Sequence, residues 1–280
     1  MLDVLPALRR LRLACPALVL ACAAGCATGL NYNDPAGPIF VGPQTIAQTI
    51  ATRTSASLRV VSFNIKFARH LDRAVDLLTR PGPLKDADVL LLQEMDAPAT
   101  ESLGRALGMN YVYVPAVLHA STHRDFGVAI LSPWALENPR KVLLPHVHRV
   151  KKMRRTAAAA TIQTPSGAVR VFAVHFESPF GADGTVRRNQ ARAVADDAAA
   201  FAGPVVIAGD FNGTAGAREL ERLGFTWLTR DVHNTLAFFD FDHIVVRGLC
   251  ATNKPPAAKA PDVTNASDHV PVWTTLQPCS

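Results

Sequence analysis

Cysteine is scarce in this sequence, at five of 280 residues, and no two cysteines form a Cys-x-x-Cys pair. A His-Glu-x-x-His motif is also absent. Both patterns are typical of zinc sites, so their absence disfavours a zinc enzyme. The motif Gly-x-Ser-x-Gly is missing as well, which disfavours a hydrolase that attacks through an activated serine.

Charged residues make up only 19% of the chain, against 49% for hydrophobic residues. A chain of 280 residues with this composition can form one large domain with a full core. No shift in composition demands a second domain, and no internal repeat is visible. The formal net charge of +6 makes the chain modestly basic.

The apolar run from Leu13 to Gly25 is too short to span a bilayer comfortably, but it has the length of the apolar region of a secretory signal. Three arginines precede it, at positions 9, 10 and 12. Its end, Ala23-Ala24-Gly25-Cys26, resembles a bacterial lipoprotein cleavage site, in which the cysteine becomes the acylated first residue. We therefore predict a signal peptide over residues 1–25 and lipidation of Cys26. Several acyl chains would anchor the protein stably, since each buried methylene adds about 0.8 kcal/mol.

Two alternatives to this interpretation are Cys22 as the lipidated residue and an ordinary signal peptide without lipidation. Ala27 follows Cys26 in place of the aspartate associated with inner-membrane retention, which favours the periplasmic face of the outer membrane. Residues 26–57 are rich in Gly, Pro, Thr, Asn and Ser and have no sustained apolar period. We predict that they form a flexible tether to a catalytic domain over residues 58–280.

Within that domain, four apolar runs end in polar side chains, as buried strands do where they open onto a surface. The polar residues at their C-terminal ends are Asn64, Glu94, His175 and Asp210. Two further runs carry polar residues at their N-terminal ends, Asp242 and the pair Asp268-His269. In sheets with mixed strand directions, all these ends can lie on one rim, which is a usual place for an active site.

The run from Val205 to Gly213 is the strongest of these signals. If its backbone stays extended through Phe211, the side chains of Asp210 and Asn212 leave the same face and can address one bound group. The alternative is a strand followed by an Asp/Asn-Gly turn. Helices are predicted around residues 71–78, 99–107 and 191–198, which makes the fold α/β.

The polar residues at these strand ends carry carboxylate, amide and imidazole groups. The carboxylates and amides make the set rich in oxygen, which suits a hard cation, Mg²⁺ or Mn²⁺. These ions keep water ligands and bind through one or two carboxylates together with substrate phosphate. The set therefore predicts metal-assisted attack of water on phosphorus.

The ordered motifs resemble those of the endonuclease/exonuclease/phosphatase family, which has the deoxyribonuclease-I-like fold. The matching pieces are Ser62-Phe63-Asn64, Leu92-Gln93-Glu94, Gly127 to Ser132, Arg155 before Thr156-Ala157, Val174-His175-Phe176, Gly209-Asp210-Phe211-Asn212, Asp242-His243-Ile244 and Ser267-Asp268-His269. The resemblance covers about Leu58 to Gln277. It implies a four-layer α/β sandwich, in which two mixed β-sheets pack face to face with helices outside.

The resemblance also implies roles for the rim residues. Asn64 and Glu94 would hold one divalent ion, with Asp268 near it, and a second ion could meet Asp210. Asp210 and Asn212 would orient the attacking water and the phosphate.

His269 would act as base or phosphate ligand and would be oriented by Asp242. His175 would contact the phosphate or the leaving oxygen. Arg155 would bind a phosphate oxygen, although Arg154 could take its place. His243, His146, His148, Asp240 and Glu177 are expected to be structural or solvated, as is Lys66.

We expect a phosphodiester hydrolase that acts on nucleic acid, as a monomer. The alternatives are a phospholipid or sphingomyelin phosphodiesterase, an inositol-phosphate phosphatase and, least favoured, a non-catalytic binding lipoprotein. Nucleic acid is favoured because residues 146–155 are strongly basic and contain no acid. The alternative for this strip is a solvated loop.

Two cysteines remain outside the proposed signal and lipid site, Cys250 and Cys279. Each lies near the end of a strand whose start carries a partner of the proposed Asp242–His269 pair. We therefore predict a disulfide between them in an oxidising compartment, the alternative being two unrelated thiols.

Overall fold

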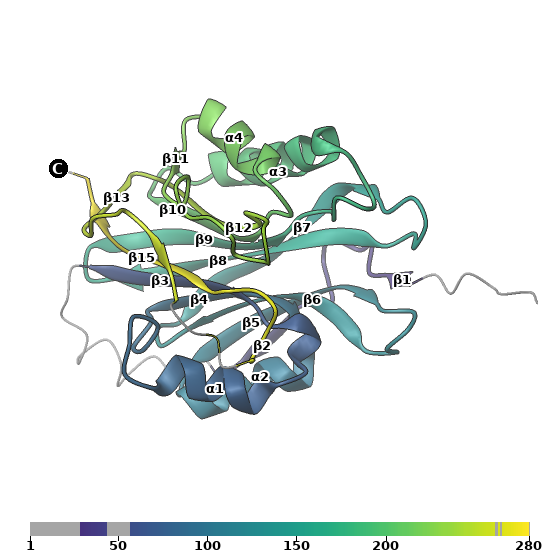
Figure 1. Cartoon of the computed structure of the whole chain (residues 1–280), viewed down its shortest axis with the longest axis horizontal. Helices are drawn as coiled ribbons and strands as arrows, with labels where there is room; N and C mark the ends of the chain where they lie inside the picture. The colour runs from purple at the N-terminus through teal and green to yellow at the C-terminus, as the bar shows by residue number, and fades with distance from the viewer. Residues whose placement is uncertain (1–28, 44–56, 261–262, 264, 280) are drawn as a thin grey trace, which may run out of the picture.

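The computed structural model describes residues 29–43, 57–260, 263 and 265–279. The predicted signal peptide and Cys26 lie outside these residues. Two mixed β-sheets pack face to face, and helices cover the outer face of each (Figure 1). The predicted fold, a sandwich of two mixed sheets with outer helices, is confirmed. No helix in the described ranges is long and apolar enough to cross a membrane.

The nine-stranded sheet has the order β1-β5-β6-β4-β3-β15-β13, with β14 against β15 and β2 against β5. Its strands are β1 (Leu30–Asn31), β2 (Phe40–Gly42), β3 (Leu58–Asn64), β4 (Val89–Met95), β5 (Asn110–Leu118), β6 (Asp125–Ser132), β13 (Leu249–Ala251), β14 (Ala258–Lys259) and β15 (Val272–Pro278). The six-stranded sheet has the order β11-β12-β10-β9-β8-β7. Its strands are β7 (Leu136–Val147), β8 (Arg154–Thr164), β9 (Gly167–His175), β10 (Val205–Asp210), β11 (Thr226–Trp227) and β12 (Asp242–Arg247).

The central strands are apolar at nearly every position because both of their faces are covered. In β4, Val89 and Leu91 point into the core between the sheets. Leu90 and Leu92 point the other way, toward α1 (Leu71–Thr79) and α2 (Ala97–Leu107). The second sheet is covered in the same manner by α3 (Gly184–Ala199) and α4 (Ala215–Arg222).

Strand direction places the polar strand ends on one rim, as the sequence predicts. β3 runs parallel to β4, and β9 runs parallel to β10. β15 is antiparallel to β3, and β12 is antiparallel to β10. The C-terminal ends of β3, β4, β9 and β10 therefore lie on the same rim as the N-terminal ends of β12 and β15.

The prediction of a flexible tether over residues 26–57 is wrong for residues 29–43. β1 and β2 both pair with β5. The ammonium group of Lys141, in β7, donates to the carbonyl oxygens of Tyr32, Asp34 and Gly37 at 2.7 to 3.1 Å. Backbone pairing and carbonyl contacts to a lysine do not require regularly spaced apolar residues. The composition of residues 29–43 therefore did not indicate that they pack against β5 and β7. Residues 44–56 of the predicted tether lie outside the described residues.

A disulfide joins Cys250 in β13 to Cys279 just after β15, as the sequence predicts. The two strands are antiparallel neighbours, with Cys250 opposite Gln277. The bond therefore fixes the last strand to the edge of the larger sheet.

Replacing both cysteines with serine is expected to lower the free energy of unfolding by about 3–4 kcal/mol in the chain-entropy model. The reason is that the two residues are 29 positions apart in the chain, so the crosslink restricts the unfolded ensemble. Urea unfolding of the oxidised protein and of the double variant measures the difference. Equal midpoints and slopes would contradict the expectation.

Candidate active site

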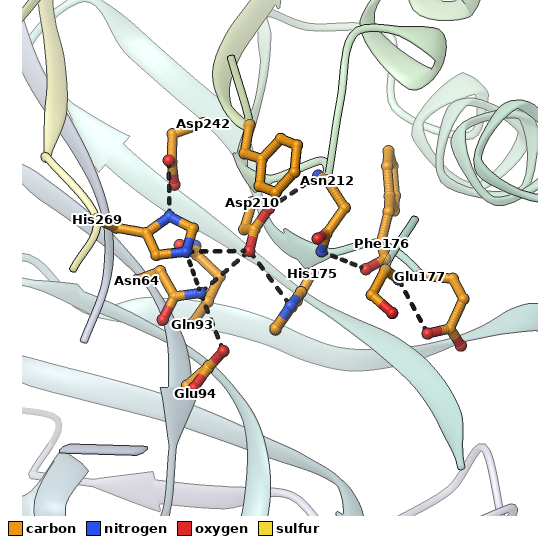
Figure 2. A network of polar contacts seen from close by, with 12 residues as sticks. Asn64, Gln93, Glu94, His175, Phe176, Glu177, Asp210, Asn212, Asp242 and His269 are labelled. Carbon is orange, nitrogen blue, oxygen red and sulfur yellow. Dashed lines mark hydrogen bonds and ion pairs between the residues drawn. The ribbon is translucent and has the colours of Figure 1, made fainter. Parts of the chain in front are cut away.

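The Asp210 carboxylate, at the end of β10, is the centre of a buried polar network (Figure 2). Its Oδ2 accepts a hydrogen bond from Asn64 Nδ2 at 3.1 Å. The same oxygen lies 3.4 Å from His175 Nε2 and 3.8 Å from His269 Nε2. The ends of β3, β9 and β10 and the segment before β15 thus contribute to one cluster, as expected from the sequence.

The backbone around Asp210 requires a glycine and a tight turn. Gly209 has φ +157°, and a β-carbon there would lie 1.9 Å from the carbonyl oxygen of Val174 in β9. After Asp210 the chain turns, with Asn212 at φ 52°, and Asp210 Oδ1 accepts from the Asn212 amide at 2.8 Å. The alternative from the sequence, a strand followed by an Asp/Asn-Gly turn, therefore describes the backbone correctly. Asp210 nevertheless belongs to the cluster.

Asn212 lies at the edge of the cluster. Its Nδ2 donates to the carbonyl oxygen of Phe176 at 3.0 Å (Figure 2). This bond joins the loop after β10 to the loop after β9. The side chain of Asn212 therefore stabilises the two loops that follow Asp210 and His175.

Asn64 and Glu94 come from the parallel neighbours β3 and β4. Asn64 Nδ2 donates to Glu94 Oε1 at 3.2 Å, and Asn64 Oδ1 accepts from the Lys66 amide at 3.0 Å. Glu94 has φ 60° and lies where the register of β4 with β6 shifts. Such a bulge redirects one side chain out of the regular alternation, and here it is the Glu94 carboxylate that meets Asn64.

His269 and Asp242 form a second buried pair. His269 Nδ1 lies 2.8 Å from Asp242 Oδ2, and both residues are buried. Because a carboxylate only accepts, Nδ1 carries a proton. His269 Nε2 therefore faces Asp210 and, at 3.5 Å, Asn64 Nδ2.

Arg155, rather than Arg154, reaches the cluster. Its Nη1 lies 3.3 Å from His175 Nδ1, and its Nε lies 3.6 Å from Glu177 Oε1. Because a guanidinium only donates, His175 Nδ1 is the acceptor and its Nε2 carries the proton toward Asp210. Glu177, expected to be structural or solvated, is buried and orients Arg155. Its only sequence signal is its place two residues after His175.

Asp268 does not join the hydrogen-bonded cluster. Its Oδ2 pairs with Lys66 Nζ at 2.8 Å, and both side chains are about two-fifths exposed. The pairing and the nearby His269 lower the pKa of Asp268, against its partial burial. Lys66 is therefore placed at the site border rather than in free solvent.

Burial sets the charge states of the cluster. It raises the pKa of Glu94, and it raises the pKa of Asp210 to about 7. For His269 burial lowers the pKa, but the Asp242 carboxylate outweighs it and brings the pKa to about 10. Burial, with Arg155 and His269 adding to it, keeps the pKa of His175 well below its usual value. His175 is thus a neutral imidazole at pH 7.

The donor set fits a hard cation that keeps most of its water. No group of three or more His, Cys, Asp or Glu side chains among the described residues could hold a metal ion. The Glu94 carboxylate offers an oxygen donor instead; the neighbouring Asn64 amide turns Nδ2 toward it, and Asn64 Oδ1 accepts from the Lys66 amide. Mg²⁺ binds through one or two carboxylates plus substrate phosphate and water. Glu94 is partly buried, and burial raises the pKa of its carboxyl, so a nearby cation would stabilise the charged form.

A cleft of about 410 Å³ opens from the cluster. Its polar wall contains Glu94, Arg155 and Glu177. Aromatic side chains form another wall, where Phe67 and His119 meet with ring centroids 5.3 Å apart and Arg155 lies over Phe126 at 5.3 Å. A group larger than a phosphate can therefore extend from the cluster into the cleft.

His243 is structural, as expected. It is fully buried, and its Nδ1 lies 3.2 Å from Thr229 Oγ1 and 3.3 Å from the Trp227 indole nitrogen. Burial lowers its pKa to about 4. It lies one residue beyond Asp242 and so points to the opposite face of β12, toward the helices.

The chain belongs to the Endonuclease/Exonuclease/phosphatase family, whose model matches residues 61–269. Members of this family hydrolyse phosphoester bonds. The matched range contains every residue of the cluster described above. A comparison with curated proteins finds no match.

Solved structures share the fold at low sequence identity. An endonuclease/exonuclease/phosphatase from Beutenbergia cavernae aligns with TM-score 0.65 and 19% identity, over 79% of this chain and 72% of that one. The human Nocturnin catalytic domain with bound sulfate aligns with TM-score 0.59 and 18% identity, over 80% and 95%. Sphingomyelinase C from Streptomyces griseocarneus aligns with TM-score 0.60 and 19% identity, over 78% and 99%.

Proposed function

We propose that this protein is a divalent-metal-dependent phosphodiesterase. The observation that carries the proposal is the convergence of Asn64, Glu94, Asp210 and His269 on one point, linked through Asn64 Nδ2 and Asp210 Oδ2. Carboxylate, amide and imidazole groups gathered within 3.1 to 3.8 Å of one another can together hold a cation, a phosphate and a water molecule.

Glu94 and Asn64 would hold Mg²⁺ or Mn²⁺, which would supply Lewis-acid stabilisation of the phosphate charge when bound. Asp210 is placed to accept a proton from the attacking water, because its Oδ2 faces the centre of the cluster. His269, held by Asp242, presents Nε2 to a phosphate oxygen. His175 Nε2 and the Arg155 guanidinium offer further donors to the phosphate or the leaving oxygen.

We prefer a phosphodiester to a phosphomonoester as the substrate because the cleft has room for a second substituent. A monoester has one substituent on phosphorus, whereas a diester has two, and the 410 Å³ cleft beside Glu94 and Arg155 can receive the second. We also propose, from the sequence, that the mature chain is lipid-anchored through Cys26 on the periplasmic face of the outer membrane.

Removal of divalent ions tests the proposal. The protein should hydrolyse bis(4-nitrophenyl) phosphate in the presence of Mg²⁺ or Mn²⁺ and should lose this activity in excess EDTA, because Glu94 and Asn64 then have no cation to present to the phosphate. Re-addition of Mg²⁺ or Mn²⁺ should restore the rate. Activity that persists after exhaustive chelation would overturn the metal-dependent mechanism.

A further inference from the structure

Exposed apolar side chains stand at the mouth of the cleft. Phe180 is 95% exposed and Val150 is 65% exposed, and both line the cleft that contains Glu94 and Arg155. Burying a side chain such as Phe or Val away from water is worth about 1.5–3 kcal/mol. Two such residues beside a polar site indicate a surface that meets something apolar.

A second exposed apolar segment flanks the other side of the cluster. Phe238 is 89% exposed and Phe239 is 51% exposed. They lie in a loop that is tied to the site, because Leu236 forms a β-bridge with His269 and Thr235 Oγ1 accepts from the Asp242 amide at 3.1 Å. Apolar side chains therefore border the catalytic cluster from two directions.

Basic side chains accompany these residues in the loop between β7 and β8. Arg149, Lys151 and Lys152 are exposed and stand next to Val150, and Lys151 also lines the cleft. A surface that only binds the phosphates of a nucleic acid would have no need for an exposed valine. Cationic and apolar side chains together are typical of a surface that binds phospholipid headgroups and inserts into the upper part of the bilayer.

The start of the described chain is fixed to the same loop (Figure 1). Asn31 Nδ2 donates to the Lys152 carbonyl at 2.7 Å, and Asn31 Oδ1 accepts from the Arg154 amide at 2.6 Å. A β-carbon on Gly29 would lie 3.1 Å from Met153, a residue of the cleft wall. Cys26 precedes Gly29 by three residues, which span at most about 10 Å.

We infer that the rim formed by Val150, Phe180, Phe238 and the basic β7–β8 loop docks onto a phospholipid bilayer, with the cleft facing the headgroups. The substrate class that follows, resting on the proposed function, is the phosphodiester of a membrane lipid. An acyl group on Cys26 would hold this rim close to the bilayer, since the described part of the chain begins at Gly29, beside Met153 of the cleft wall.

Vesicle binding tests the docking surface separately from catalysis. All described elements lie after residue 28, so a chain that begins at Ala27 keeps the whole described fold and carries no acyl group. This chain is mixed, in EDTA, with vesicles of phosphatidylethanolamine and phosphatidylglycerol, and the bound fraction is measured by flotation. Val150→Ser/Phe180→Ser should weaken binding by about tenfold or more.

Leu223→Ser is the matched control, because Leu223 is 46% exposed but lies at the far end of α4 from the site. Its vesicle binding should equal that of the unsubstituted chain. Absence of vesicle binding by the unsubstituted chain, or equal loss in the control, would overturn the docking surface. Binding to a DNA or RNA oligonucleotide with a steep salt dependence, and none to vesicles, would overturn it in favour of nucleic acid. Hydrolysis of bis(4-nitrophenyl) phosphate with Mn²⁺ tests the proposed function independently of all these outcomes.

Discussion

Replacing Glu94 with alanine is expected to lower the turnover of a small phosphodiester by about three orders of magnitude or more while leaving the fold intact. The Glu94 carboxylate accepts from Asn64 Nδ2 at the end of the β3–β4 pair, and the bulge in β4 directs it toward the cluster. Without it, Asn64 alone offers a cation a single neutral oxygen. The fold should persist because this side chain is recessed at the rim, and burial raises its pKa rather than stabilising its charge.

Glu101→Ala provides the control for this prediction. Glu101 is an exposed acid on α2 that pairs with Arg105 at 2.7 Å, and surface pairs of this kind contribute little to stability. Its turnover should match that of the wild-type protein. A second readout is thermal: Mg²⁺ should raise the Tm of the wild-type protein and of Glu101→Ala, but not that of Glu94→Ala. Full activity of Glu94→Ala would remove Glu94 from the proposed metal site.

The central strands were predictable because both sides of each sheet are covered. Val89 to Leu92 form an uninterrupted apolar run for that reason, and the run ends where the rim begins. The docking of residues 29–43 was not predictable, because it depends on backbone hydrogen bonds to β5 and on the Lys141 ammonium group. Such contacts leave no periodicity in the sequence.

The candidate site shows the same division. Asn64, His175 and Asp210 could be expected together from the sequence because each ends an apolar strand, and such ends can share one rim in mixed sheets. The bulge that redirects Glu94 and the pairing of Lys66 with Asp268 could not be predicted. They depend on local bends within β4 and in the segments that follow β3 and precede β15, which the apolar pattern does not predict.

Only part of the proposed membrane-docking surface was apparent in the sequence. The segment Leu236 to Phe239 contains consecutive apolar residues and is apparent without a structure. Phe180 and Val150 are isolated among polar and small residues, and such residues are usually buried by packing from elsewhere in the chain. Only their exposure of 95% and 65% beside the cleft distinguishes them from core residues.

Asp242→Asn is expected to lower turnover by about two to four orders of magnitude, although the Asp242 side chain reaches the cluster only through His269. The Asp242 carboxylate accepts from His269 Nδ1 at 2.8 Å, which fixes the ring and directs Nε2 toward Asp210. An asparagine amide can present its NH₂ group to Nδ1 and so favour the other tautomer. The negative charge of Asp242 favours imidazolium and raises the pKa of His269, so its removal should lower that pKa.

Histidine NMR titration of the EDTA-treated protein separates this positioning role from a merely structural one. The His269 resonance should titrate at a lower pH in Asp242→Asn than in the wild-type protein. Asp240→Asn is the matched control, because Asp240 pairs with His233 at 2.9 Å outside the cluster. It should leave the titration of His269 and the turnover of bis(4-nitrophenyl) phosphate close to wild-type values. If Asp242→Asn lost turnover through unfolding, the loss would be accompanied by a fall in Tm. With the Tm retained and the pKa of His269 unchanged, Asp242 would not be the group that orients the histidine, and Asp210, 3.8 Å from His269 Nε2, would take that role.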